Sequence, residues 1–114
     1  MKKDPVVFLD HVLECIKIIE EYAVGKSKTD FLESLQFQDS VIRRLEVIGE
    51  AVKNLPENFK EDHPEIQWRR TAGLRDVVVH KYFGIDLEVT WEIVKNDLPV
   101  LKNNITKILE EIKE

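Results

Sequence analysis

Hydrophobic residues recur at helical spacing in three parts of the chain. In each part they are separated by alternating steps of three and four residues, which places them on one face of a helix. The three stripes are Leu9, Val12, Ile16, Ile19 and Ala23; Val41, Leu45, Ile48, Val52 and Leu55; and Leu98, Leu101, Ile105, Ile108 and Ile112. This pattern predicts three long amphipathic helices, the last of which starts after Asp97.

Capping and breaking residues predict the ends of these helices. Asp4 and Pro5 suit the start of the first helix and Gly25 suits its end. Pro56 closes the second helix. Gly49 lies in the middle of that helix, where glycine costs about 1 kcal/mol of helix propensity relative to alanine. We therefore expect a close backbone contact at Gly49.

Weaker signals lie on either side of the second stripe. Phe31, Leu32 and Leu35 form a short apolar face that predicts a short helix before it. Residues 56–64, which follow it, are polar and begin and end with proline. That composition predicts a surface loop within one domain.

The segment before the third stripe allows two interpretations. Its β-branched residues 77–79 would permit a strand, but no second run of similar character exists to pair with them. We therefore predict a helix over residues 65–82, ended by Gly84 and followed by a short turn over residues 87–94. The whole chain, residues 1–114, is then a single all-α domain, an up-and-down bundle of about five helices.

Composition and charge narrow the function. The 114 residues include four Gly and four Pro, and 43% are hydrophobic, which is typical of a folded helical protein. The formal net charge is −5, so any binding of nucleic acid depends on a local basic patch. The N-terminal residues form neither a signal peptide nor a membrane span. We expect a cytoplasmic protein that does not bind membranes.

Common catalytic and metal-binding signatures are absent from the sequence. Cys15 is the only cysteine, and we expect an ordinary buried or half-buried thiol. The histidines, His11, His63 and His80, have no Cys or His at ligand spacing, so we expect no metal site. The chain has no glycine-rich phosphate loop and no nucleophile elbow. Trp68 and Trp91 are expected to be core or interface aromatics.

Residues 67–83, QWRRTAGLRDVVVHKYF, reverse the sign of the local charge. They hold four basic residues and one acidic residue, a net of +3 within a chain of −5. The segment also brings together a permanent cation, a carboxylate, an imidazole that titrates near neutrality and a phenol. These four side chains belong to Arg75, Asp76, His80 and Tyr82.

Helical spacing brings only some of these groups together. Asp76 and His80 are four residues apart and would share a helix face, where the carboxylate can fix the tautomer of the imidazole. Arg75 lies about 140° around an ideal helix from His80, at about 100° per residue. A frayed helix end or a two-fold dimer would bring them together. By residue type alone, such side chains are more often solvated or packing residues than catalytic ones, and the arginine pairs 43–44 and 69–70 are usually solvated.

The pattern Arg75-x4-His80-x-Tyr82 resembles the signature of HepT-like proteins of the HEPN group, which are toxin ribonucleases of prokaryotic toxin–antitoxin pairs. Further blocks along nearly the whole chain resemble the same family. They are residues 31–32 (FL), 38–45 (QDSVIRRL), 48–51 (IGEA), 64–69 (PEIQWR), 73–75 (GLR), Trp91 and 97–99 (DLP). The family commonly has Asn after the arginine, where this chain has Asp76.

This resemblance implies a HEPN-type homodimer in which two copies of the motif face each other across the two-fold axis and form one composite cleft. The RNA would supply its own 2′-hydroxyl as nucleophile, so cleavage would need neither metal nor cofactor. His80 would be the general acid or base, Arg75 would stabilise the phosphate charge and Asp76 would be the orienting group. The basic residues expected to hold the RNA backbone are Arg69, Arg70 and Lys81.

The resemblance also implies a protein partner, a minimal nucleotidyltransferase that acts as antitoxin. Tyr82 resembles the acceptor on which that partner places adenylate from ATP. A bulky anion two residues from His80 would fill the cleft and repel incoming phosphate. Two other interpretations stay open: a non-catalytic helical subunit that binds a nucleotidyltransferase or receives its modification, and a plain helical dimer in which the motif is structural.

Overall fold

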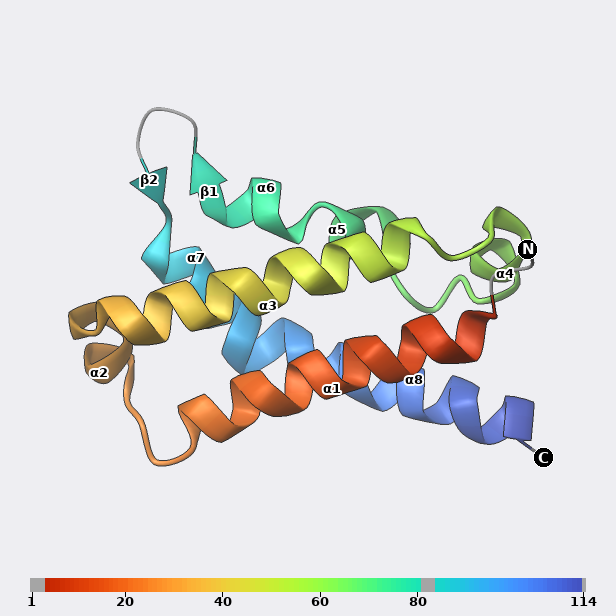
Figure 1. The fold of residues 1–114 in the computed structure, drawn as a ribbon, viewed down its shortest axis with the longest axis horizontal. Helices are drawn as coiled ribbons and strands as arrows, with labels where there is room; N and C mark the ends of the chain where they lie inside the picture. Colours follow the sequence, from red (N-terminus) through yellow and green to blue (C-terminus); the bar gives the residue numbers. More distant parts are fainter. Residues whose placement is uncertain (1–3, 81–83, 114) are drawn as a thin grey trace.

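The helices of the computed structural model run back and forth along the molecule as an up-and-down bundle (Figure 1). The structure describes residues 4–80 and 84–113. The α-helices are α1 (Pro5–Ala23), α2 (Lys28–Glu33), α3 (Leu35–Lys53), α4 (Glu57–Asp62), α5 (Trp68–Ala72), α6 (Leu74–Val78), α7 (Leu87–Glu92) and α8 (Leu98–Lys113). The π-helical segment η1 (Ile93–Asp97) joins α7 to α8. The predicted all-α up-and-down bundle is confirmed.

The three predicted stripes form the centre of the hydrophobic core. Every residue of the second stripe is buried, four of them on α3 and Leu55 just after its end. The stripes on α1 and α8 are also buried except at their ends, where Ala23 is half-buried and Ile112 is 43% exposed. α1 packs most extensively against α3 and also contacts α8. Because isolated helices of this length are marginal in water, this mutual burial supplies most of their stability.

Gly49 makes the close contact that its position predicts. It lies where α3 packs against α5, and a Cβ atom placed on it would be 2.7 Å from the carbonyl oxygen of Ala72. Real Cβ atoms do not approach backbone oxygen so closely. A glycine at this position therefore lets α5 lie directly on α3.

Both tryptophans pack against the core, as predicted. Trp68 is 8% exposed, and its Nε1 donates hydrogen bonds to the carbonyl oxygens of His63 at 2.9 Å and Lys60 at 3.1 Å. Trp91 stacks on Phe31 with the ring centroids 5.4 Å apart. These contacts fix α5 to the end of α4 and α7 to α2. None of the described helices combines the length and apolar character needed to cross a bilayer.

The short elements differ in part from the predictions. The short helix predicted before the second stripe is α2, but of its predicted apolar face only Phe31 is buried. Leu32 is 37% exposed, and Leu35, which lies after the end of α2, is 70% exposed. The loop predicted over residues 56–64 contains α4. The turn predicted over residues 87–94 is helical, because it holds α7 and the first residues of η1. α8 begins at Leu98, directly after Asp97, as predicted.

The single helix predicted over residues 65–82 is wrong, because residues 65–67 lie in a turn before α5 and α6 ends at Val78. Gly73 separates α5 from α6, and the chain then forms the two-residue strand β1 (Val79–His80). β1 pairs antiparallel with β2 (Gly84–Ile85), with His80 opposite Gly84. Gly84 has φ +77°, so it serves this hairpin and not a helix end. A strand of two residues needs no long β-branched partner, and the absence of one therefore did not exclude it.

Candidate functional site

His80 lies at the end of β1, beside the start of α7. Its Nε2 is 3.7 Å from Oδ2 of Asp86. Asp86 is the N-cap of α7, where its Oδ1 accepts a hydrogen bond from the Val89 N–H at 3.0 Å. Its backbone is held as well, because its N–H donates to the Val78 carbonyl at 2.7 Å and its carbonyl accepts from Thr90 Oγ1 at 2.6 Å. A firmly placed carboxylate therefore faces the imidazole.

Asp86 was not among the residues singled out in the sequence. The expected contact between Asp76 and His80 required a continuous helix, and α6 ends at Val78. Asp76 is exposed on α6, and its role in orienting His80 stays a prediction. The signal that could have found Asp86 is its place before a helix, since aspartate is a preferred N-cap residue.

Arg75 projects from α6 toward α3, where it binds Glu46. Its Nε is 2.9 Å from Glu46 Oε2. The other carboxylate oxygen, Oε1, is 2.7 Å from Nη1 of Arg43, one turn earlier on α3. The side chains of Arg75 and Arg43 are 52% and 62% exposed. One carboxylate therefore holds two solvent-accessible guanidinium groups, a combination that the sequence pattern did not suggest.

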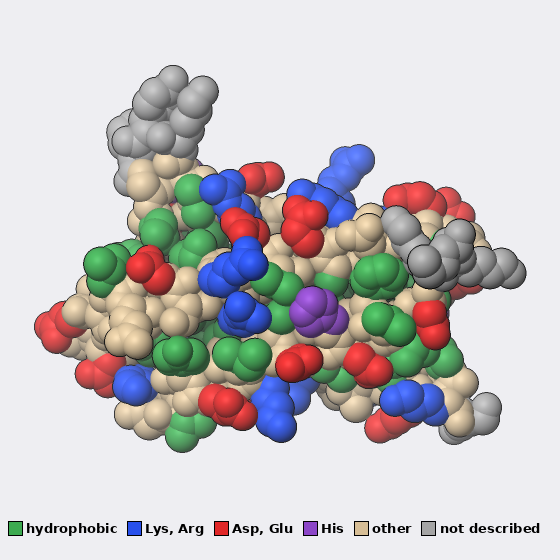
Figure 2. All heavy atoms as spheres, in the orientation of Figure 1, with side chains coloured by type: hydrophobic (Ala, Val, Ile, Leu, Met, Phe, Trp, Pro, Cys, Tyr) green, Lys and Arg blue, Asp and Glu red, His purple; other side chains and the backbone are tan. Residues whose placement is uncertain are grey.

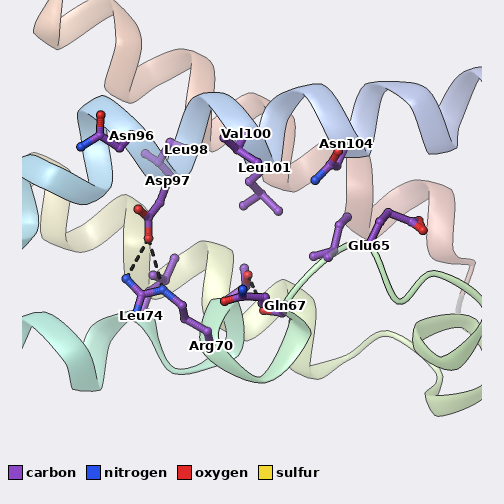
Figure 3. A pocket seen from close by; sticks show the side chains of 12 residues that line it. Glu65, Gln67, Arg70, Leu74, Asn96, Asp97, Leu98, Val100, Leu101 and Asn104 are labelled. Atoms are coloured by element: carbon purple, nitrogen blue, oxygen red, sulfur yellow. Dashed lines mark hydrogen bonds and ion pairs between the residues drawn. The ribbon is translucent and has the colours of Figure 1, made fainter.

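Arg70 lies in a different place from Arg75. Its Nε and Nη2 donate to Oδ2 of Asp97 at 3.2 and 2.8 Å, across a pocket of about 390 Å³ between α5–α6 and η1–α8 (Figure 3). The pocket has an apolar part from Ile66, Leu74, Leu98, Val100 and Leu101 and a polar part from Glu65, Gln67, Arg70, Thr71, Asn96, Asp97 and Asn104. Arg69 is exposed on α5. The structure thus directs the guanidinium groups of Arg70 and Arg75 to different partners.

Two predicted site residues, Lys81 and Tyr82, lie outside the described residues. The RNA contact expected of Lys81 and the modification expected of Tyr82 stay predictions. Among residues 4–80 and 84–113, no three His, Cys, Asp or Glu side chains are arranged to hold a metal ion.

Cys15 is the buried thiol that the sequence predicts. It is 1% exposed on α1, and burial raises the pKa of the thiol, an effect that the nearby guanidinium of Arg44 partly opposes. The thiol therefore stays protonated near neutral pH, which makes it a poor nucleophile.

Acidic and basic side chains are mixed on the face formed by α1 and α3 (Figure 2). This face shows no large continuous basic area among its described residues. The distribution agrees with the net charge of −5. A polyanion would therefore be attracted by small groups of cations, such as Arg43 and Arg75 beside Glu46, and not by the surface as a whole.

Family comparison identifies the class of protein that this fold and sequence define. A model of the ribonuclease HepT-like family matches residues 12–108. The chain belongs to the HepT-like ribonuclease family.

Several named proteins are similar to the chain over almost all of its length. A Methanocaldococcus jannaschii protein named as a gamma-glutamylcyclotransferase and provisional RNase is 52% identical over 98% of this chain, which spans only 50% of that relative. A probable ribonuclease HepT of Thermococcus cleftensis is 45% identical, over 95% of this chain and 98% of its own. A further provisional RNase of M. jannaschii is 46% identical, over 99% of this chain and 91% of its own. No solved structure matches the chain.

Proposed function

We propose that this chain is a metal-independent endoribonuclease, cytoplasmic and active as a homodimer, and the toxin of a toxin–antitoxin pair. Membership of the HepT-like ribonuclease family supports the ribonuclease activity. The name of the T. cleftensis relative, a probable ribonuclease HepT, points the same way. We take residues 1–114 to act as one domain that contributes half of a composite cleft.

The observation that carries this proposal is the solvent exposure of Arg75 and His80 and the carboxylate beside each of them. Both side chains are about half exposed, and each is held by a carboxylate from another element, Glu46 of α3 and Asp86 before α7. An accessible guanidinium and an accessible imidazole are the groups that cleavage of a phosphodiester requires. A two-fold axis near them would double both groups, which gives one imidazole to act as base and one to act as acid.

The reaction then needs only the side chains and the RNA. One His80 removes the proton of a 2′-hydroxyl, and the oxygen attacks the adjacent phosphorus. The bond from phosphorus to the 5′-oxygen breaks, and the second His80 gives this oxygen a proton. Arg75 stabilises the charge on the pentacoordinate phosphate. Asp86 positions His80 by charge attraction, because its Oδ2 lies 3.7 Å from Nε2, and this leaves Nδ1 to face the substrate.

The same proposal includes a nucleotidyltransferase antitoxin that transfers adenylate from ATP to Tyr82. The support is the resemblance of the Arg75-x4-His80-x-Tyr82 pattern to the family signature. Intact mass measured after incubation with the nucleotidyltransferase and ATP is expected to show adenylate additions. Tyr82→Phe should remove them, and Tyr22→Phe, which changes the only other tyrosine, should not. Additions that survive Tyr82→Phe would exclude Tyr82 as the acceptor.

The central test measures RNA cleavage by the purified protein in the presence of a chelator. We expect cleavage by the unchanged protein and none by Arg75→Ala or His80→Ala, with the dimer retained in each variant by light scattering. Full activity of both variants would refute these roles. A protein that forms a stable complex with the nucleotidyltransferase but never turns over RNA would instead be a non-catalytic subunit.

A further inference from the structure

We propose that Arg43 is an RNA-binding residue, and that Arg43 and Arg75 form a single site for a backbone phosphate, with Glu46 as the residue that positions both guanidinium groups. This inference rests on the proposed ribonuclease function and adds to it a second cation and a positioning carboxylate. Both come from α3, outside the basic segment of residues 67–83.

The geometry places the two guanidinium groups side by side. Glu46 uses one carboxylate oxygen for Arg43, at 2.7 Å, and the other for Arg75, at 2.9 Å. Arg43 comes from α3 and Arg75 from α6, so the carboxylate joins two helices that pack against each other. The two cations are therefore no farther apart than one carboxylate can span.

Charge and hydrogen-bonding capacity fit a phosphate. Two guanidinium groups at this separation repel each other, and the carboxylate between them offsets that repulsion while the three side chains keep a net charge of +1. A guanidinium has five N–H donors, and Glu46 occupies only part of each set. Because Arg43 and Arg75 are 62% and 52% exposed, their remaining donors can reach a phosphate and bind its oxygens through charge-assisted hydrogen bonds.

Another pair on α3 shows what is special about this arrangement. Lys53 and Glu50 have the same spacing as Arg43 and Glu46, with Nζ 3.4 Å from Oε1. Exposed pairs of this kind contribute little to stability, and their presence alone indicates no function. The Arg43–Glu46 pair differs because Glu46 also holds Arg75, which the proposed mechanism places on the reacting phosphate. Glu50 and Lys53 therefore provide matched control substitutions.

Binding of a non-cleavable RNA tests the phosphate site without catalysis. The probe is a single-stranded oligonucleotide with 2′-O-methyl groups throughout, titrated over a range of salt concentrations. Arg43→Ala should weaken binding about fivefold and reduce the slope of log K against log salt by about 0.7, the value for one phosphate contact to a single strand. Lys53→Ala should leave both quantities unchanged. Equal behaviour of these two variants would overturn the proposal.

Cleavage kinetics test the positioning role of Glu46. Glu46→Gln removes the charge that holds the two arginines but makes the region more positive, so we expect kcat to fall about tenfold while KM does not rise. Glu50→Gln should change neither constant. A kcat for Glu46→Gln equal to that of Glu50→Gln would refute the role.

The failures of the two proposals are distinguishable. A protein that binds the probe through Arg43 but cleaves no RNA would leave the phosphate site standing and refute the ribonuclease. A protein that cleaves RNA equally well with and without Arg43 would refute the phosphate site and leave the ribonuclease proposal standing. Absence of any RNA binding would overturn both.

Discussion

Asp86 Oδ2 lies 3.7 Å from His80 Nε2, while Oδ1 of the same carboxylate caps α7. One side chain therefore both starts a helix and faces the imidazole of His80 on β1. This double use connects the position of His80 to the folding of α7. Removal of the Asp86 side chain would therefore disturb both the start of α7 and the orientation of His80, and the two effects on activity could not be separated.

Asp86→Asn separates these two roles. Asparagine is as good an N-cap as aspartate, so α7 should persist and the free energy of unfolding should change by less than about 0.5 kcal/mol. The negative charge beside His80 disappears, and RNA cleavage should fall at least about tenfold. Chemical denaturation and a cleavage assay with the same preparation measure the two effects.

Two control variants sharpen this prediction. Asp4→Asn changes another capping aspartate, at the start of α1, and should affect neither stability nor cleavage. Asp76→Asn changes the other carboxylate proposed to orient His80. If Asp76→Asn abolished cleavage while Asp86→Asn kept it, Asp76 and not Asp86 would be the orienting residue.

Gly49→Ala should destabilise the protein although it lies inside a helix. Helix propensity favours alanine by about 1 kcal/mol. The new Cβ would lie 2.7 Å from the Ala72 carbonyl oxygen, so α5 must move away from α3. We expect a net loss of about 1 to 3 kcal/mol in the free energy of unfolding.

Gly73→Ala is the matched control for Gly49→Ala. A Cβ on Gly73 would have its nearest neighbour, the Arg69 carbonyl oxygen, at 3.6 Å, which is an ordinary contact. The free energy of unfolding of Gly73→Ala should change by less than about 1 kcal/mol, which is the difference in helix propensity between glycine and alanine. A Gly49→Ala protein as stable as Gly73→Ala would show that the helices separate without cost.

Long helices could be predicted from the sequence because several turns repeat the same spacing. Every residue of the stripe from Val41 to Val52 on α3 is buried, and the contact at Gly49 followed from its unfavourable position. Short elements have too few turns for this signal. Leu32 of α2 and Leu35 at the start of α3 are exposed. α4 follows Pro56, a residue that can begin a helix as well as end one.

The candidate site was predicted only in part, for a related reason. Arg75 and His80 stand out because they lie together in a segment of reversed charge. Their partners do not, because Glu46 comes from another helix and Asp86 follows a hairpin that the pattern did not predict. Which carboxylates meet these cations depends on how α6 packs on α3 and where the chain turns after Val78. Neither is encoded in local spacing.

The buried thiol of Cys15 predicts a stability change at alkaline pH. Burial raises its pKa, so the folded protein keeps the proton at pH values where the unfolded chain loses it. This contribution is complete below the unfolded pKa of about 8.5 and is lost as pH rises through the folded value. Between pH 8 and 10, the free energy of unfolding should therefore fall more steeply for the unchanged protein than for Cys15→Ala. Parallel curves for the two proteins would contradict this.

Arg69 and Arg70 should contribute unequally to RNA binding. Arg70 already donates two hydrogen bonds to Asp97, so a phosphate must compete with a carboxylate for it, while Arg69 is exposed on α5. Arg69→Ala should weaken binding of a single-stranded RNA more than Arg70→Ala does. Asp97→Asn should strengthen binding, and this gain should vanish when Arg70→Ala is combined with it. If the gain persisted in the double variant, it would come from the lost negative charge alone and not from release of Arg70.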